Sequence, residues 1–235
     1  MAPVAVRLGL IGCGTVGSAF AASFAERRAA LESITSTRLR LTRVAVLRPN
    51  LRDPRLAPAP LTDDAASIAA DPRIDIVIEA SGAPNAADWI RTALDRGAAV
   101  VTANKQALAR DPALLAALAT RTSRLHCEGA VAAAVPIVRA LRESLAGEEI
   151  HALRGVLNGT TTYVLGRLEQ QRPFAEAVTD AQRDGFAERD PIDDLSGADA
   201  AAKLAILCSI AWKVCGARRW TPGLSSNLDC PESFE

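Results

Sequence analysis

The feature that most constrains the fold is a glycine-rich turn between an apolar run and a helical pattern near the N-terminus. Residues 4–11 are mostly apolar, and the sequence GCGTVG follows at once at residues 12–17. Val16, Phe20 and Phe24 then recur every four residues, the spacing of one helical face. Strand, glycine turn and helix form the context that a dinucleotide-binding fingerprint requires. The alternative is a glycine-rich turn with a structural role only.

Each position of the fingerprint has a physical reason. Gly12 permits the tight turn, Gly14 lets the backbone approach a pyrophosphate, and Gly17 lets helix and strand pack closely. The free N–H groups at the start of the helix then face the anion at the positive end of the helix dipole. We therefore expect the following residues to bind a dinucleotide: Gly12, Gly14, Thr15, Val16 and Gly17.

Strand and helix patterns alternate over the first 130 residues. Short apolar runs predict buried parallel strands at residues 39–47, 75–80 and 98–102, with a further candidate at 125–128. Helices are predicted between them, at residues 86–96 and 105–120. This alternation predicts an α/β fold with a doubly wound parallel (Rossmann) sheet. Ligands of such sheets bind beyond the carboxyl ends of the strands, where Ser81, Gly82 and Lys105 are expected.

The end of the second strand bears on which cofactor is bound. An acidic residue there would bind the ribose 2′-hydroxyl of NAD, but this chain has Arg48. A guanidinium suits a 2′-phosphate, which favours NADP. NAD stays an alternative, because Asp53 is a later acid, and a solvent-exposed basic loop is the structural alternative.

The second half of the chain is predicted to be mixed α and β. Helices are predicted at residues 131–145 despite Pro136, and at 163–169, 174–184 and 198–212. A strand is predicted at residues 149–157, and periodicity ends at about residue 213, which predicts an irregular tail. We expect a dinucleotide-binding domain at residues 1–130. An α+β substrate domain, incomplete at its C-terminal end, is expected at 131–235.

Composition narrows the class of protein. The 27 basic and 27 acidic residues leave no net field that would attract nucleic acid or an anionic membrane. No apolar run has the roughly 18 residues of a membrane helix. Five cysteines without a CxxC pair fit the reduced thiols of a cytoplasmic protein. Two histidines make a histidine-rich metal site or a serine–histidine triad unexpected.

Acidic residues gather in the segment GFAERDPIDDLSGADAAAKLAIL at residues 185–207. On a helix, Asp199 and Lys203 are four residues apart and share one face. The structural alternative is a helix start, with acids favouring the first turn and a surface ion pair of little energetic weight.

With these motifs in order, the chain resembles homoserine dehydrogenase. The resemblance covers roughly residues 4–210, and four stretches carry it: GCGTVG at 12–17, VTANKQALA at 101–109, GVLNGTTTYVL at 155–165, and the acid-rich segment at 185–207. The resemblance implies reduction of L-aspartate 4-semialdehyde to L-homoserine, on the route to threonine, methionine and isoleucine. It also implies a small amino-acid substrate and a homodimer.

The resemblance also implies roles for individual residues. Lys105 should lie where nicotinamide and substrate meet, and Lys203 should carry the proton to and from the substrate oxygen. A nearby ammonium stabilises the alkoxide that develops during hydride transfer and can supply that proton. Asp199 is expected among the catalytic residues with these lysines, and with Glu188 and Asp194 it should hold the amino and hydroxyl groups of homoserine. The expected substrate-binding residues are Glu188, Asp194, Asn158, Gly159 and Thr160.

Two features depart from the family pattern. The family implies a sodium site built from Glu128 and from backbone carbonyls, here those of Val131, Ala133 and Val135. Family members have glycines where this chain has Ala133 and Ala134, and alanine tolerates fewer backbone conformations. The family also continues well past residue 235, so this chain is expected to be a shortened member.

Three hypotheses follow for the function. The first is an active, NADP-preferring homoserine dehydrogenase. The second is a catalytically impaired, nucleotide-binding remnant of that family. The third is another Rossmann oxidoreductase acting on a sugar or an amino acid, and the combined NGTT and acid-rich segments argue against it.

Overall fold

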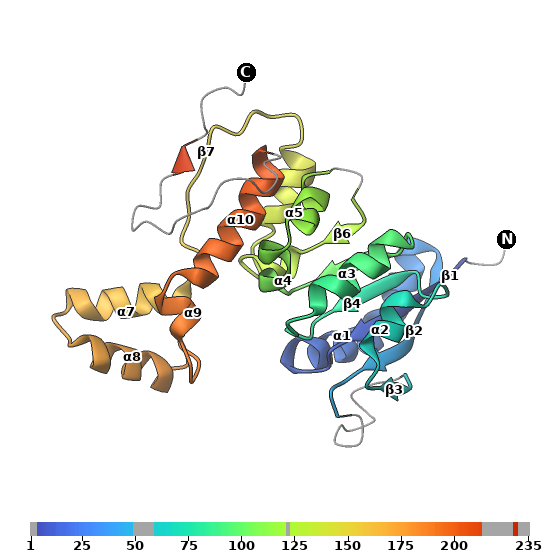
Figure 1. The fold of residues 1–235 in the computed structure, drawn as a ribbon, viewed down its shortest axis with the longest axis horizontal. Helices are drawn as coiled ribbons and strands as arrows, with labels where there is room; N and C mark the ends of the chain where they lie inside the picture. The colour runs from blue at the N-terminus through green and yellow to red at the C-terminus, as the bar shows by residue number, and fades with distance from the viewer. Residues whose placement is uncertain (1–3, 49–58, 121–122, 213–227, 230–235) are drawn as a thin grey trace.

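The computed structural model describes residues 4–48, 59–120, 123–212 and 228–229. Its centre is a parallel six-stranded sheet in the order β3-β2-β1-β4-β5-β6 (Figure 1). The strands are β1 (Val4–Ile11), β2 (Thr37–Ala45), β3 (Leu61–Thr62), β4 (Ile76–Glu79), β5 (Ala99–Thr102) and β6 (Leu125–His126). The predicted doubly wound sheet is confirmed, and its strand order reverses between β1 and β4.

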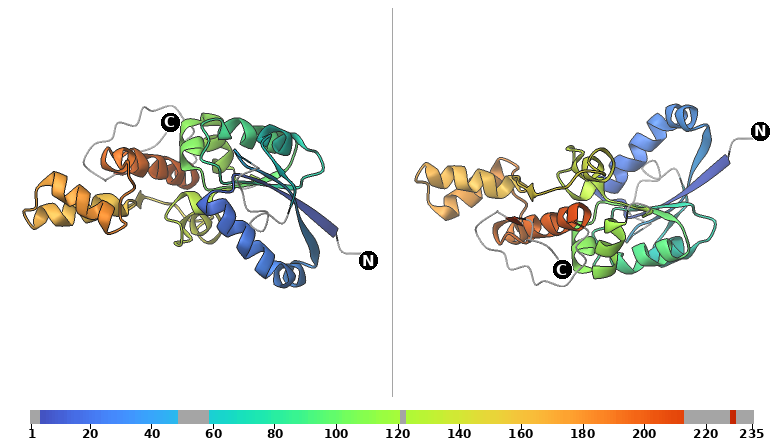
Figure 2. Two further views of the ribbon diagram at one scale, coloured as in Figure 1. Left: turned by 90° about the horizontal axis from the view of Figure 1, so that it is seen from below. Right: turned by 90° about the horizontal axis from the view of Figure 1, so that it is seen from above.

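Helices cover both faces of this sheet (Figure 2). One face carries α1 (Thr15–Thr35), and the other carries α2 (Ala65–Ala70), α3 (Ala86–Asp95), α4 (Lys105–Arg110) and α5 (Pro112–Ala119). Successive strand residues serve opposite layers, as the two-residue period of a strand requires. Leu10 belongs to the cluster that contains Phe24 of α1, whereas Ile11 belongs to the cluster around Ile68 and Ile90.

The helix predicted at residues 105–120 is two helices, so the prediction was wrong at residue 111. The Asp111 carboxylate accepts hydrogen bonds from the backbone N–H of Ala113 (2.9 Å) and of Leu114 (3.2 Å), which caps α5. Pro112 occupies the first turn of α5, where its missing N–H costs nothing. A proline also disfavours helical backbone in the residue before it, so the chain breaks here.

The helix predicted at residues 131–145 was wrong over its first half. A short 3-10 turn, η3 (Glu128–Ala130), leads into Ala132 and Ala133, whose φ angles of 54° and 37° are left-handed. Regular helix starts only with α6 (Ile137–Arg139), directly after Pro136, and continues as a wider π turn, η4 (Ala140–Ser144). Proline at the helix start explains the boundary, because it has no N–H to offer to a preceding turn.

Within the part of the chain that the structure describes, the strand predicted at residues 149–157 pairs only over β7 (Ala152–Leu153), which is antiparallel to β8 (Leu228–Asp229). Val156 is 80% exposed, so apolar composition alone does not bury this segment. The chain then enters α7 (Gly159–Glu169), four residues earlier than predicted, because the Asn158 side chain caps it by accepting from the Thr161 N–H.

The remaining helices are a projecting hairpin, a short connecting helix and one long helix that packs on the core. The hairpin of α7 and α8 (Phe174–Arg183) projects away from the sheet (Figure 1). A short α9 (Ile192–Leu195) leads into α10 (Ala198–Trp212), which packs against α4 and α5. The Ser209 hydroxyl donates to the Leu115 carbonyl (2.5 Å), and Ile206 lies in the same core cluster as Leu108. The last predicted helix therefore completes the core beside the Rossmann sheet.

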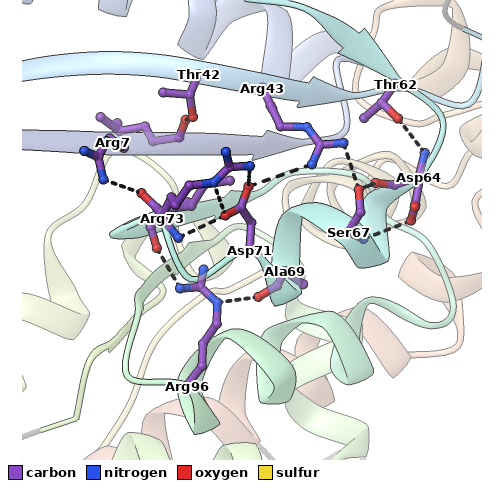
Figure 3. A network of polar contacts seen from close by, with 12 residues as sticks. Arg7, Thr42, Arg43, Thr62, Asp64, Ser67, Ala69, Asp71, Arg73 and Arg96 are labelled. Carbon is purple, nitrogen blue, oxygen red and sulfur yellow. Dashed lines mark hydrogen bonds and ion pairs between the residues drawn. The ribbon is translucent and has the colours of Figure 1, made fainter.

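A polar network closes the connection between α2 and β4, at the amino ends of the strands (Figure 3). The buried Asp71 carboxylate accepts from Arg73 Nε (2.9 Å) and Nη2 (2.8 Å). These hydrogen bonds lower the pKa of Asp71 to about 2. Arg96 donates to the Ala69 and Ile74 carbonyls (2.6 and 2.7 Å), so the network is structural and lies away from the predicted ligand-binding edge.

The tail predicted to be irregular from about residue 213 lies outside the described residues, apart from β8. Over the ranges that the structure describes, no helix has both the length and the apolar character needed to cross a membrane.

The break between α4 and α5 yields a stability prediction. Asp111→Ala removes the cap of α5 and a buried partner of Arg91 (2.5 Å). We expect the free energy of unfolding in urea to fall by about 1–2 kcal/mol, the usual cost of a lost cap. Asp88→Ala removes the other, exposed partner of Arg91 and should cost less than about half as much. Equal losses would contradict the capping role.

Candidate active site

The glycine turn lies where β1 meets β4. Gly12 has φ of +89°, and a Cβ there would collide with the Ser81 backbone at the end of β4. A Cβ on Gly17 would collide with the Gly12 carbonyl oxygen. Both positions therefore require glycine, one for its backbone conformation and both for the close approach of neighbouring backbone.

The space beside this turn fits the pyrophosphate of a dinucleotide. A Cβ built on Gly14 would lie in open space, more than 4 Å from the described atoms outside its own local backbone, so the backbone is accessible to a ligand there. The 21-residue helix α1 begins at Thr15 without a side-chain cap, and Thr15 and Val16 are exposed. Its first N–H groups can therefore bind an anion at the positive end of the helix.

The other predicted cofactor residues lie after strands of the same sheet. Ser81 and Gly82 follow β4, and Gly82 has a left-handed φ of +66°. Arg48 follows β2 and is exposed. Because the strands are parallel, these positions and the glycine turn are at the carboxyl edge of one sheet.

The centre of the candidate site is a carboxylate held between two ammonium groups. Asp199, in the first turn of α10, is 4% exposed. Its Oδ1 lies 3.0 Å from Lys105 Nζ at the start of α4, and its Oδ2 lies 2.7 Å from Lys203 Nζ. Lys203 also donates to the Leu157 carbonyl (2.7 Å). The predicted pair of Asp199 and Lys203 is thus a partly buried ion pair, and Lys105 joins it.

The environment of Asp199 favours its ionised form. Burial raises the pKa of Asp199, but hydrogen bonds from Lys203, Lys105 and Asn158 outweigh that effect and bring the pKa below its ordinary value. The carboxylate is therefore charged at neutral pH and holds both ammonium groups in place.

The NGT segment supports the carboxylates. Asn158 Nδ2 donates to Asp194 Oδ1 (2.7 Å) and to Asp199 Oδ2 (2.9 Å), while its Oδ1 accepts from the Thr161 N–H (2.8 Å). Thr160 Oγ1 lies 2.8 Å from Asp194 Oδ2. Asn158 and Thr160 were predicted to contact substrate, whereas in the structure their side chains contact carboxylates of the protein. Gly159 is exposed, with open space around it.

A cavity of about 320 Å³ opens beside these groups. Its lining includes Lys105, Glu188, Asp194 and Asp199, which were predicted as site residues, together with Asp190, Asp193, Ile192 and Gln106. Gln106 was not among the predicted site residues, although it directly follows Lys105 in the sequence. An acidic wall beside a lysine suits a small zwitterion, because carboxylates attract an ammonium group and the lysine attracts an anion.

The candidate sodium segment has an unusual backbone. Both Glu128 oxygens accept backbone N–H groups, from Val138 (3.1 Å) and Arg139 (2.8 Å). The left-handed residues are Ala132 and Ala133, one position earlier than the pair that sequence analysis singled out. Carbonyl and carboxylate oxygens are the ligands that a hard cation prefers. The sodium site stays a prediction. Within the described ranges, no cluster of three or more His, Cys, Asp or Glu side chains could hold a metal.

Comparison with known proteins agrees with this architecture. A family model described as "Homoserine dehydrogenase, NAD binding domain" matches residues 12–131, and one described as "Homoserine dehydrogenase" matches residues 136–217. Homoserine dehydrogenase of Corynebacterium glutamicum is 38% identical over 213 residues, covering 88% of this chain and 47% of the relative. That of Mycobacterium tuberculosis is 44% identical over 155 residues, covering 65% and 35%.

Solved structures give the same result. The crystal structure of a homoserine dehydrogenase from Thiobacillus denitrificans superposes with a TM-score of 0.78 at 34% identity. The match covers 90% of this chain and 50% of that one. The chain thus spans about half the length of the relatives that it matches.

The lowered pKa of Asp199 predicts a pH-dependent contribution to stability. Asp199→Asn should lower the free energy of unfolding near neutral pH by on the order of 1–3 kcal/mol, because two ammonium groups lose a charged partner. A carboxyl whose pKa is lowered in the fold stabilises above its ordinary value of 3.8 and loses that effect as the pH falls through the lowered pKa.

The difference between parent and Asp199→Asn should therefore shrink in acid. Urea denaturation of both proteins between neutral pH and about pH 3 measures it, with the interval set by the ordinary carboxyl pKa. A difference that stays constant over this range would contradict the ionised, lysine-bound state of Asp199.

Proposed function

The chain belongs to the homoserine dehydrogenase family, and we propose that it interconverts L-aspartate 4-semialdehyde and L-homoserine with NADP as cofactor. The observation that carries the proposal is the pair of lysines on one buried Asp199, beside an acidic cavity. The glycine turn that fits a dinucleotide follows β1, and Lys105 follows β5 of the same sheet.

The acidic cavity provides for the substrate ammonium. Glu188 and Asp194 line it with Asp199, and Asn158 holds Asp194 and Asp199 in fixed relation through its two N–H groups. Opposite charges in a partly water-excluded cavity attract more strongly than in bulk water. We therefore assign amino-group recognition to these carboxylates, with Gly159 leaving room for the substrate next to the NGT turn.

Lys203 is assigned the proton transfer. When bound, the nicotinamide supplies the hydride for reduction of the aldehyde. Lys203 Nζ then donates a proton to the oxygen that becomes an alkoxide, and in the reverse direction it accepts that proton. Lys105, on the opposite oxygen of Asp199, places a second positive charge beside the developing alkoxide. Asp199 orients both lysines.

The choice of NADP rests on Arg48, and the rest of the cellular setting rests on the family. An exposed guanidinium after β2 suits a 2′-phosphate, with NAD as the alternative. We also propose a cytoplasmic enzyme in the synthesis of threonine, methionine and isoleucine, acting as a homodimer. A monovalent cation would be held by Glu128 and by the carbonyls of Val131, Ala133 and Val135.

A second candidate function follows from the length of the chain. It spans about half of its relatives, so a catalytically impaired nucleotide-binding protein is the competing hypothesis. A spectrophotometric assay of homoserine oxidation on purified, size-checked protein separates the two, with NADP and NAD compared. Homoserine-dependent formation of NADPH supports the enzyme, and NADPH binding without turnover supports the competitor.

Arg48→Ala tests the cofactor assignment. Hydrogen bonds to charged groups contribute about 1.5–3 kcal/mol, so the variant should bind NADPH at least about tenfold more weakly, with little change for NADH. Fluorescence titration with both nucleotides measures the preference. Arg40→Ala, which removes an exposed arginine within β2, is the matched control and should leave both affinities unchanged. Equal parental affinities for NADPH and NADH would reject the role of Arg48.

Lys203→Ala tests the proton carrier. Loss of a positioned acid–base group should lower kcat by about 100-fold or more. NADPH affinity should stay near the parental value, because Lys203 contacts Asp199 and Leu157 and lies on α10, away from the glycine turn. Steady-state kinetics on folded protein measure kcat. Near-parental turnover in Lys203→Ala would show that the ion pair with Asp199 has a structural role only.

A further inference from the structure

Glu79 is a buried acidic residue to which the proposed reaction assigns no role. It is the last residue of β4, beside the point where the strand order reverses, and it is 1% exposed. Among the described charged residues it is the most deeply buried. Burying a carboxylate is costly unless hydrogen bonds or charges compensate it, so its partners indicate what it does.

The partners of Glu79 come from the loop after β4 and from the end of β5. Its Oε1 accepts from the backbone N–H of Ser81 (2.8 Å) and from the Ser81 hydroxyl (2.6 Å). Its Oε2 accepts from the Thr102 hydroxyl at the end of β5 (2.7 Å). All three donors are neutral N–H or O–H groups. The ends of β4 and β5 pair through their backbones, with Glu79 opposite Thr102, and the Glu79 carboxylate adds a side-chain link between them.

Each of these contacts continues into a candidate binding element. Ser81 packs so closely on the glycine turn that a Cβ on Gly12 would collide with it. Thr102 Oγ1 also accepts from the Asn104 N–H (3.0 Å), and Asn104 Oδ1 accepts from the Ala107 N–H (3.0 Å). The latter bond caps α4, whose first residue is Lys105. An unbroken chain of contacts thus runs from the cofactor turn through Glu79 to Lys105.

We propose that Glu79 is a positioning residue that holds the Ser81–Gly82 loop and the Asn104–Lys105 loop in fixed relation at the carboxyl edge of the sheet. The positioning itself stands on the contacts alone. Its consequence, correct placement of the cofactor relative to Lys105, rests on the proposed function.

Two substitutions of Glu79 have different expected effects on the two loops. Glu79→Ala removes all three acceptor contacts and should loosen both loops. Glu79→Gln keeps one acceptor oxygen, and Ser81 offers it two donors, its N–H and its hydroxyl, so the amide oxygen should stay on Ser81. The amide NH₂ then faces Thr102, whose hydroxyl loses its acceptor. Glu79→Gln should therefore loosen the Asn104–Lys105 loop while it spares the Ser81–Gly82 loop.

Thr102→Val isolates the second contact. It removes the hydroxyl that links Glu79 to Asn104 and leaves both contacts with Ser81. The variant should resemble Glu79→Gln. The matched control is Asp71→Asn, which alters another buried carboxylate at the opposite edge of the same sheet (Figure 3).

The first readout is hydrogen exchange of the full chain without cofactor. Glu79→Ala should speed exchange at the amides of Ser81, Asn104 and Ala107, which report on the two loops. Glu79→Gln and Thr102→Val should speed exchange at Asn104 and Ala107 only. Asp71→Asn should leave all three amides at the parental rate. Parental exchange in Glu79→Ala, or equal acceleration in Asp71→Asn, would overturn the proposal.

The second readout is the NADPH dissociation constant from fluorescence titration. Glu79→Ala should weaken binding by about tenfold or more, and Asp71→Asn by about twofold or less, at matched fractions of folded protein. A parental protein that binds no NADPH refutes the proposed function, while the exchange data still decide the positioning role. Parental NADPH affinity in Glu79→Ala would overturn the link between this residue and the cofactor.

Discussion

The architecture of the candidate site depends on one interaction, the Asp199 carboxylate shared by Lys105 and Lys203. A lone carboxylate in this position, 4% exposed, would strongly destabilise the fold, and two lysines at 3.0 and 2.7 Å compensate the lost hydration. Lys105 begins α4 and Lys203 lies within α10, so the interaction joins the helix after the last long strand of the Rossmann sheet to the helix that contains the end of the acid-rich segment. Asn158 adds Asp194 to the same cluster, and the acidic wall of the cavity is thereby fixed in relation to both lysines.

Packing brings these groups together before any charge is considered. Helix α10 lies against α4 and α5, with Ile206 in the core cluster that contains Leu108 and with Ser209 bonded to the α5 backbone. The parallel strands end at one edge, which places the glycine turn, the loop after β4 and Lys105 beside one another. Glu79 connects the last two by hydrogen bonds. Apolar packing thus sets the approximate geometry, and a few buried carboxylates refine it.

Sequence reasoning succeeded where the signal is local and periodic. The glycine spacing predicted β1, its turn and α1, and the helix at residues 198–212 was predicted with the bounds that the structure shows. It failed where backbone conformation depends on single residues. Asp111 with Pro112 divides one predicted helix, and left-handed Ala132 and Ala133 interrupt another. The supporting role of Asn158 was not predictable, because a motif gives the residue but not which of its polar atoms face protein groups.

The most direct test of the shared carboxylate is a double-mutant cycle between Lys105→Met and Asp199→Asn, read as free energies of unfolding in urea at neutral pH. Methionine keeps much of the lysine side-chain volume while it removes the charge. If Asp199 links α10 to α4 through Lys105, the coupling energy between the two residues should be about 1 kcal/mol or more, within the range for residues in direct contact. Additive effects, with a coupling energy below about 0.3 kcal/mol, would show that the two residues act independently and would contradict the account.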